Sequence, residues 1–136
     1  MTVKLGIAIV GIGLYLAGAN VPLAAHHAFA AEFDANKPVE FTGVVTKMEW
    51  VNPHVWISLD VKKPDGSIEP WKFEAGTPNV LFRRGFTKES LLPGTQVKVD
   101  GYQAKDGANR GVGVSLTFTD GKKLFLGSNA PGGKGQ

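Results

Sequence analysis

The chain has 136 residues, with 15 Lys or Arg, 12 Asp or Glu and three His, which gives a net charge of +3. This near balance gives no argument for nucleic acid or an anionic membrane surface as a partner. The sequence contains no cysteine, which excludes disulfide bonds and a cysteine-bound zinc site.

Residues 1–25 have the pattern of a signal peptide. Lys4 gives a short positive start, "LGIAIVGIGLYLAG" is apolar and uncharged, and "ANVPLAA" ends in small residues. We expect cleavage after Ala25 and export, to the periplasm if the source is a Gram-negative bacterium. The fit is imperfect, because Leu23 stands where a smaller residue is usual. A cut after Ala30 is the less favoured alternative.

The other interpretation of this segment is an uncleaved membrane anchor. Its apolar run, Leu5–Ala19, is short against the roughly 20 residues that a spanning helix needs, and its glycines weaken a long helix. A membrane partner is therefore expected only if the segment is retained. Without it, about 110 residues remain, enough for one domain with a modest core. Losing Lys4 leaves 14 basic residues against 12 acidic ones, a net charge of +2.

The mature chain divides into a leader, residues 26–37, a β-rich domain, residues 38–127, and a tail, residues 128–136. In the leader, Phe29 and Phe33 are the only large apolar side chains. The tail, "SNAPGGKGQ", is rich in glycine and polar residues, so we expect it to be disordered.

The first half of the domain predicts three strands. "VEFTGVVTKMEW" gives a strand over 39–50 that bends at Gly43, and "VNPH" breaks it because proline lacks an N–H. In "VWISLDVK", alternation puts Val55 and Ile57 on one face and Trp56 on the other. An Asp-Gly turn in "KPDGS" leads into the third strand, "IEPWKFEAG".

The second half begins with a short helix in "TPNVLFRRGF". Thr77 suits the N-cap, Pro78 the first helical position and Gly85 the position after the end. "TQVKVDGYQAK" and "VGVSLTFTD" are the fourth and fifth strands, and a short last strand is expected over Lys123–Leu126.

This order of elements predicts an all-β fold with small α content. Its form is an OB-like five-stranded Greek-key β-barrel with a short helix between strands 3 and 4. The bent first strand and the position of the helix favour this fold. A small sandwich or an open meander built from the same strands is the alternative.

Several motifs of the mature chain resemble one known family. They are "HHAFAAEFD", "GVVTKMEWVNPHVWISLDV" and "RRGFTKESLLPGTQVKVDGYQAKDGANR". The matching positions are His26, His27, Asn52, Pro53, His54, Trp56, Arg83, Arg84, Gly85 and Gly101. The family is a group of small secreted bacterial proteins classed as a domain of unknown function. The resemblance implies secretion and a small β-rich fold, but no activity and no catalytic residue.

The three histidines predict a copper site. A cut after Ala25 leaves His26 with a free α-amino group beside its own imidazole, and these two nitrogens can chelate one metal ion. His27 or His54 could supply a third nitrogen. Three nitrogen ligands with open positions suit Cu(II), which leads the divalent first-row metals in affinity.

The same histidines also have simpler interpretations. Residues just after a signal peptide are often disordered, so the pair at His26 and His27 need bind nothing. His54 follows Pro53 at a strand start, where its ring could bond a neighbouring carbonyl. The spacing is no zinc signature, because His-Glu-x-x-His is absent and there is no cysteine.

The competing class of function is a non-metal ligand-binding or protein-interaction module. Trp56 and Trp71 could line one face of the barrel, the face on which OB folds bind their ligands. The partner would then be an unknown small ligand or a protein. The structural alternative is that Trp56 covers a second hydrophobic layer under the leader, since tryptophan is highly buried on average.

Arg83 and Arg84 form a basic pair at the end of the predicted helix. Cations there complement the helix dipole, and an anion site is the other interpretation. Neither a Gly-x-Ser-x-Gly motif nor a phosphate-binding loop is present. The sequence therefore predicts a binding protein and identifies no catalytic residue.

Overall fold

The computed structural model describes residues 28–134, so His26, His27 and the signal segment lie outside the described residues. A helical turn over residues 28–32 leads into a mostly β domain. Its elements are β1 (Phe33–Glu49), β2 (Trp56–Lys62), β3 (Ile68–Glu74), α2 (Pro78–Arg83), β4 (Gln96–Ala104), β5 (Arg110–Phe118) and β6 (Lys123–Phe125).

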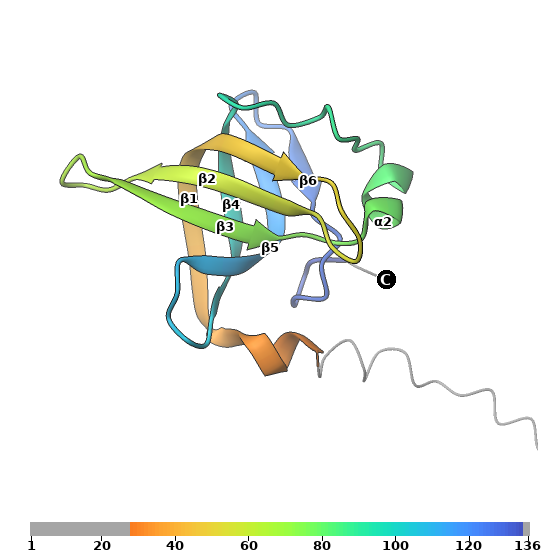
Figure 1. Ribbon diagram of the computed structural model, residues 1–136, viewed down its shortest axis with the longest axis horizontal. Helices are drawn as coiled ribbons and strands as arrows, with labels where there is room; N and C mark the ends of the chain where they lie inside the picture. The colour runs from red at the N-terminus through yellow and green to blue at the C-terminus, as the bar shows by residue number, and fades with distance from the viewer. Residues whose placement is uncertain (1–27, 135–136) are drawn as a thin grey trace, which may run out of the picture.

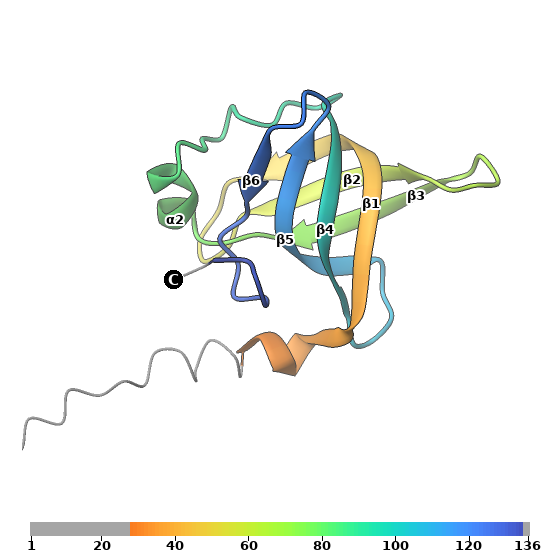
Figure 2. The ribbon, with the colours of Figure 1, turned by 180° about the vertical axis from the view of Figure 1, so that it is seen from behind.

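The strands form one sheet whose pairings close into a ring, as Figures 1 and 2 show from opposite sides. Their order is β3-β2-β1-β4-β5-β6, and these neighbours are antiparallel. β3 also pairs with β5 in parallel, over residues 72–74 and 110–112. Strands β1 to β5 are therefore joined in one closed ring of hydrogen-bonded pairs. The short β6 pairs with β5 outside this ring.

The hairpin of β2 and β3 sets the register that later positions the site. Asp65 Oδ1 accepts hydrogen bonds from the backbone N–H and the hydroxyl of Ser67, at 2.9 and 2.5 Å. Gly66 has a φ of +86°, which glycine adopts without strain. The hairpin predicted from the Asp-Gly turn is confirmed, and its register places Trp56 opposite Glu74.

The predicted helix between the third and fourth strands is also confirmed. The hydroxyl of Thr77 accepts a hydrogen bond from the backbone N–H of Val80 at 3.2 Å, and Gly85 ends the helix with a φ of +79°. Leu81 turns its buried side chain into the core. Between residues 28 and 134 no helix has the length and apolar character that crossing a membrane requires.

The bend predicted in the first strand coincides with a close approach of two strands. A Cβ atom on Gly43 would lie 2.8 Å from the backbone oxygen of Asp60 on β2, so the contact needs glycine. Just beyond this point, between Val45 and Lys47, the register of β1 with β2 shifts. The irregularity lies where β1 changes neighbours, since β1 pairs with β4 over residues 33–44 and with β2 over residues 43–49.

Two apolar clusters organise the fold. The core cluster lies between the strands of the ring and under α2, and its largest fully buried side chains are Phe73, Ile57, Leu59, Leu81, Leu91 and Leu116. The end cluster lies where the helical turn meets the last described residues, and it comprises Phe29, Phe33, Ala104, Val112 and Ala130. Figures 1 and 2 both show the helical turn and the C-terminal segment at this same end.

The end cluster includes residues from the predicted leader, the predicted domain and the predicted tail. β1 begins at Phe33, inside the segment predicted as a leader, because Phe33 is buried and pairs with Ala104 of β4. Residues 128–134 were predicted as part of a disordered tail, but the structure packs some of them against the domain. There, Ser128 and Ala130 are buried, and the Ser128 hydroxyl donates to the backbone oxygen of Gly113 at 2.5 Å.

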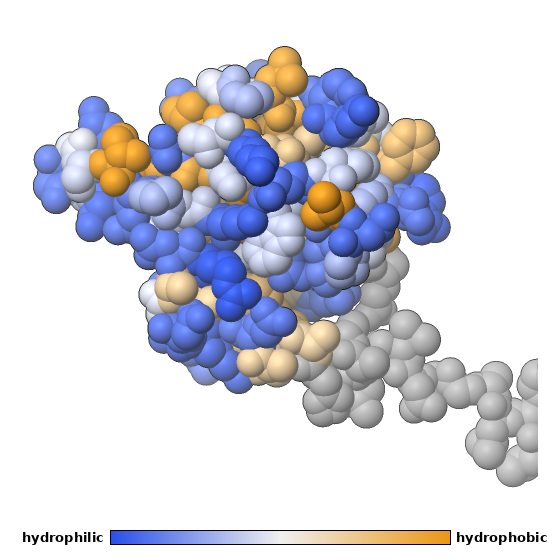
Figure 3. Space-filling view, in the orientation of Figure 1, coloured by the Kyte–Doolittle hydropathy of each residue, from blue (hydrophilic) through white to orange (hydrophobic). Residues whose placement is uncertain are grey.

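The surface carries separate apolar side chains. Figure 3 shows them scattered among polar residues on the face in view. The exposed large hydrophobic residues are Val44, Val51, Ile68, Phe82 and Leu92. Single exposed residues of this kind are normal on soluble domains, so this face offers no continuous apolar patch for a protein partner.

Candidate functional site

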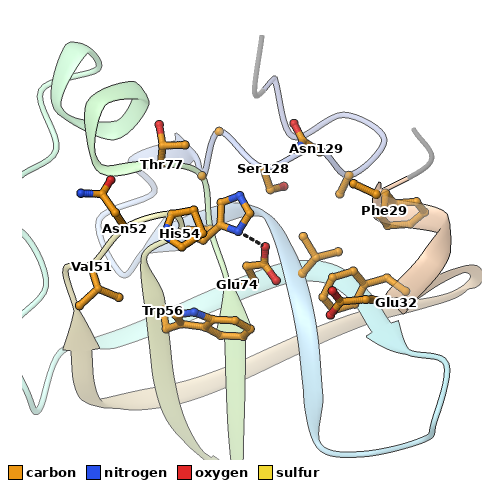
Figure 4. A pocket seen from close by; sticks show the side chains of 18 residues that line it. Phe29, Glu32, Val51, Asn52, His54, Trp56, Glu74, Thr77, Ser128 and Asn129 are labelled. Atoms are coloured by element: carbon orange, nitrogen blue, oxygen red, sulfur yellow. Dashed lines mark ion pairs between the residues drawn. The ribbon is translucent and has the colours of Figure 1, made fainter. Parts of the chain in front are cut away.

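A pocket of about 400 Å³ opens beside the end cluster (Figure 4). Four stretches of chain and Val112 of β5 surround it: the turn over 28–33, residues 51–56 before and at the start of β2, residues 74–77 at and after the end of β3, and residues 127–130. Pockets for small ligands hold roughly 300–1,000 Å³ and are mostly apolar with a few polar groups. This pocket matches that description in both size and lining.

His54 and Trp56 enter the pocket from one face of the same extended segment. Side chains two positions apart in such a segment point the same way, and the intervening Val55 points into the core, where it is fully buried. The backbone of Val55 is fixed on both sides. Its N–H donates to Gly76 at 3.0 Å, and its carbonyl accepts from Ala75 at 2.8 Å.

An imidazole and a carboxylate meet at the centre of the pocket. Nδ1 of His54 lies 2.5 Å from Oε1 of Glu74 (Figure 4). Glu74 reaches this point because the β2–β3 register places it opposite Trp56. The His54 side chain is 32% exposed and that of Glu74 only 14%, so the pair is partly withdrawn from water.

The charge of Glu74 is only partly compensated. Burial has the largest effect and raises the pKa of Glu74 above its ordinary value. The His54 ring lowers this pKa, Glu32 raises it further, and Arg110 lowers it. Because the net shift of the pKa is upward, the pocket disfavours the ionised carboxylate when no ligand is bound.

Trp56 supplies an aromatic surface below the imidazole and the carboxylate. Figure 4 shows its indole beneath Glu74 and His54. Nζ of Lys72 lies 5.0 Å from the centre of the indole ring, and the same amine pairs with Glu49 at 2.7 Å. Lys72 thus packs against Trp56 without lining the pocket.

The N-terminal wall of the pocket is held by aromatic and ionic contacts. The ring of Phe29 stacks on that of Phe33 at 6.1 Å between centres and meets Tyr102 edge-on at 5.6 Å. Oε2 of Glu32 lies 2.9 Å from Nη1 of Arg110. The Arg110 guanidinium also lies 5.5 Å from the centre of the Phe33 ring. These contacts dock residues 28–33 onto β4 and β5.

The structure brings two of the predicted site residues together and separates a third. His54 and Trp56 both line the pocket. Trp71 is 5% exposed in the core cluster, with its ring 4.5 Å from that of Phe41. It stands three positions before Glu74 on β3, and an odd spacing puts it on the opposite face of the strand. The two tryptophans therefore do not form one ligand-binding row.

Arg83 and Arg84 also lie away from the pocket. Nε of Arg83 donates to the backbone oxygen of Asn79 at 3.3 Å, within the last turn of α2. Arg84 ends the helix, and its guanidinium donates to the backbone oxygens of Phe125 and Lys134. Both arginines have structural partners, in line with cations at a helix C-terminus.

Glu74 is the central pocket residue that sequence reasoning missed. A faint signal was present, because counting back from the Asp-Gly turn places residues near 74 opposite Trp56. Residues 28–134 contain no group of three or more His, Asp or Glu side chains arranged to hold a metal ion. His54 and Glu74 are two potential ligands, so a metal at this pocket needs others.

The fold and pocket define a small, mostly β domain with one half-buried polar pair in an aromatic pocket. The chain belongs to a family described as a family of unknown function, DUF6152, whose model matches residues 14–114. The family assigned from the sequence motifs is thereby confirmed as one of unknown function. No curated protein matches the chain.

Among solved structures, the chain resembles the mitochondrial single-stranded DNA-binding protein Rim1 of S. cerevisiae. The identity is 10%, the TM-score is 0.39, and the match covers 61% of this chain and 93% of that one. A likeness at this level carries no argument about what this chain binds.

Proposed function

We propose that this protein is an exported, periplasmic binding protein that holds a copper ion at the pocket of His54 and Glu74. One observation carries the proposal: Ala28 lines the same pocket as His54. Two residues of chain span at most about 7 Å. The proposal therefore needs only a short link between Ala28 and the ligand nitrogens of His26.

Signal cleavage after Ala25 would complete the ligand set. It gives His26 a free amine beside its imidazole, and His54 adds a nitrogen from the folded domain. Imidazole and amine nitrogens suit Cu(II). His27 is the alternative source of the third nitrogen, and the His54→Ala variant below separates the two.

Glu74 supports this role by its contact with His54. Two atoms that both offer lone pairs repel each other at 2.5 Å, so a proton must lie between Nδ1 and Oε1. Where that proton belongs to a neutral imidazole, Nε2 carries the free lone pair. Metal-bound histidines commonly have their other ring nitrogen against a carboxylate, which fixes the ring and raises its basicity.

We further propose that the ring of strands is an OB-like barrel. The support is the closed pairing of β1 to β5, with α2 between β3 and β4. In OB folds, the region of strands 2 and 3 carries the ligand site. The pocket here takes His54, Trp56 and Glu74 from the paired ends of β2 and β3.

The test is a copper titration of the exported protein. Intact mass gives the mature N-terminus, and calorimetry with Cu(II) gives stoichiometry and affinity. We expect a chain starting at His26 that binds one copper, with affinity reduced at least about tenfold in His26→Ala and in His54→Ala. Lys88→Ala is the control and should bind normally, because Lys88 is exposed and does not line the pocket.

Two results would contradict the copper proposal. One is a mature chain that starts at another residue. The other is unchanged copper affinity in His54→Ala, with His54→Gln behaving alike. Thermal unfolding of each variant shows whether a lost affinity reflects a lost fold.

A non-metal ligand is the second candidate function. The observation that favours it is the lining of the pocket, where Trp56, Phe29 and Phe33 surround the two polar side chains. Aromatic walls around a few oriented polar groups are typical of sites for small organic molecules.

A further inference from the structure

The pocket has an acidic character. Its ionisable lining side chains are Glu32, His54 and Glu74, and within residues 28–134 no lysine or arginine lines it. Two basic residues beside the pocket have acidic partners, since Arg110 pairs with Glu32 and Lys72 pairs with Glu49. A neutral His54 therefore leaves two carboxylates facing one cavity.

The two carboxylates influence each other across the pocket. Glu32 is among the groups that raise the pKa of Glu74, and burial of Glu74 raises it more. Arg110 pairs with Glu32 and lowers the pKa of Glu74, but the net shift of the Glu74 pKa is still upward. Glu74 is therefore only partly compensated, and an added positive charge beside it would be favourable. A cation bound between these carboxylates would therefore stabilise their ionised forms.

The remaining walls suit an apolar body with flat faces. Trp56 lies below the Glu74 carboxylate, and Phe29 and Phe33 form the opposite side, as Figure 4 shows for the labelled residues. An ammonium group is attracted to the faces of such rings. A hydrated metal ion would gain little from these walls.

We propose that the pocket binds a small organic cation, an amine carried on an aromatic or apolar ring. The ammonium group lies between the carboxylates of Glu74 and Glu32, and the ring rests against Trp56 and Phe29. The inference rests on the second candidate function, the pocket as a site for a non-metal ligand. It requires neither copper nor residues before Ala28.

Three probes of similar shape and different charge test it: benzylamine, benzyl alcohol and benzoate. Each is titrated into the ¹⁵N-labelled mature protein at pH 7 with EDTA present, and saturable shifts of the Trp56 indole N–H and of the backbone N–H of Glu74 are followed. We expect saturable binding of benzylamine, with the alcohol and the acid about tenfold weaker or more, because the amine alone makes charge-assisted hydrogen bonds.

Glu74→Gln keeps the size of the side chain and an acceptor oxygen for His54 while removing the charge. It should weaken benzylamine about tenfold and leave benzyl alcohol unchanged. Glu40→Gln is the matched control, because Glu40 pairs with Lys98 away from the pocket. That variant should bind benzylamine like the wild type, and unchanged amide spectra of both variants would show an intact fold.

The outcomes separate two failures. If benzyl alcohol or benzoate binds as tightly as benzylamine, or if Glu74→Gln changes nothing, the cation inference is wrong while the non-metal site stands. If no probe gives a saturable shift at Trp56 up to the solubility limit, the non-metal site itself is overturned. The copper proposal is tested separately, by the titration without EDTA described above.

Discussion

The core cluster and the end cluster are built in different ways. Strands with alternating side chains supply most of the core cluster, and Phe73, Ile57 and Leu59 are fully buried within it. The end cluster takes Phe29 from a helical turn and Ala130 from the C-terminal segment, and a pocket opens beside it. The core cluster secures the ring, and the end cluster shapes a cavity.

The difference shows how a small domain can hold an electrostatically unfavourable group. Glu74 stands at the end of β3, one residue from the fully buried Phe73, and its backbone is fixed by the ladder with β2 and β5. The carboxylate therefore stays in the pocket although burial disfavours its charge. Rigid strands position the polar pair, and the terminal segments give it walls.

The largest effect is expected from emptying the core cluster. Phe73→Ala should lower the free energy of unfolding by about 3–5 kcal/mol, because it leaves a cavity at a fully buried site. Chemical denaturation with circular dichroism measures this. A cost below about 1 kcal/mol would mean that the ring does not depend on this cluster.

Emptying the end cluster should do less to stability and more to the pocket. Phe29→Ala removes a side chain that is 7% exposed, stacks on Phe33 and meets Tyr102 edge-on. We expect a loss of about 1.5–3 kcal/mol and a loss of ligand binding, with the strand signals of the amide spectrum retained. Collapse of the whole spectrum would show that the two clusters are one cooperative unit.

The two tryptophans give a matched pair, because Trp71 lies in the core cluster and Trp56 lines the pocket. Trp71→Phe should cost about 1–3 kcal/mol, since Trp71 is buried against Phe41 and its Nε1 donates to Glu69 at 2.7 Å. Trp56→Phe should cost less than about 1 kcal/mol and change the ligand site instead. Thermal unfolding and ligand titration on both variants compare them, and equal stability losses would contradict the distinction.

The smallest effect concerns pH. The pKa of Glu74 is raised in the folded state, so its contribution to stability is fully present below the ordinary carboxyl pKa and is lost as pH rises through the folded pKa. Glu74→Gln should therefore gain stability relative to the wild type as pH rises from 4 to 7. Denaturation at both values, with EDTA present, measures the difference, and a gain at the acid end would reverse the sign assigned here.

Local pattern predicted the strands, the hairpin and the capped helix. Alternation in "VWISLDVK" correctly placed Trp56 on the face of the strand opposite to that of the buried Val55 and Ile57. The Thr77 cap and the Gly85 stop also lie where they were predicted. Each depends on neighbours within a few residues, where steric and hydrogen-bonding preferences act directly.

The pocket could be predicted only in part. His54 and Trp56 were identified, but Trp71 was grouped with them because its parity relative to Trp56 depends on the register between two strands. Phe29 and Ala130 belong to one cluster, which joins the two ends of the domain. No periodicity in the sequence predicts this packing. A tail rich in glycine and small residues is predicted to be disordered from its composition. In the structure, its small residues pack closely around the buried Ser128.

The parallel pairing of β3 with β5 has a consequence for how the molecule is made. The ring can close only when residues 110–112 pair with residues 72–74. Contacts between distant parts of a chain form slowly, because loop-closure entropy is lost before the contacts stabilise the structure. A chain emerging from a ribosome therefore cannot close the ring until residues 110–112 are available.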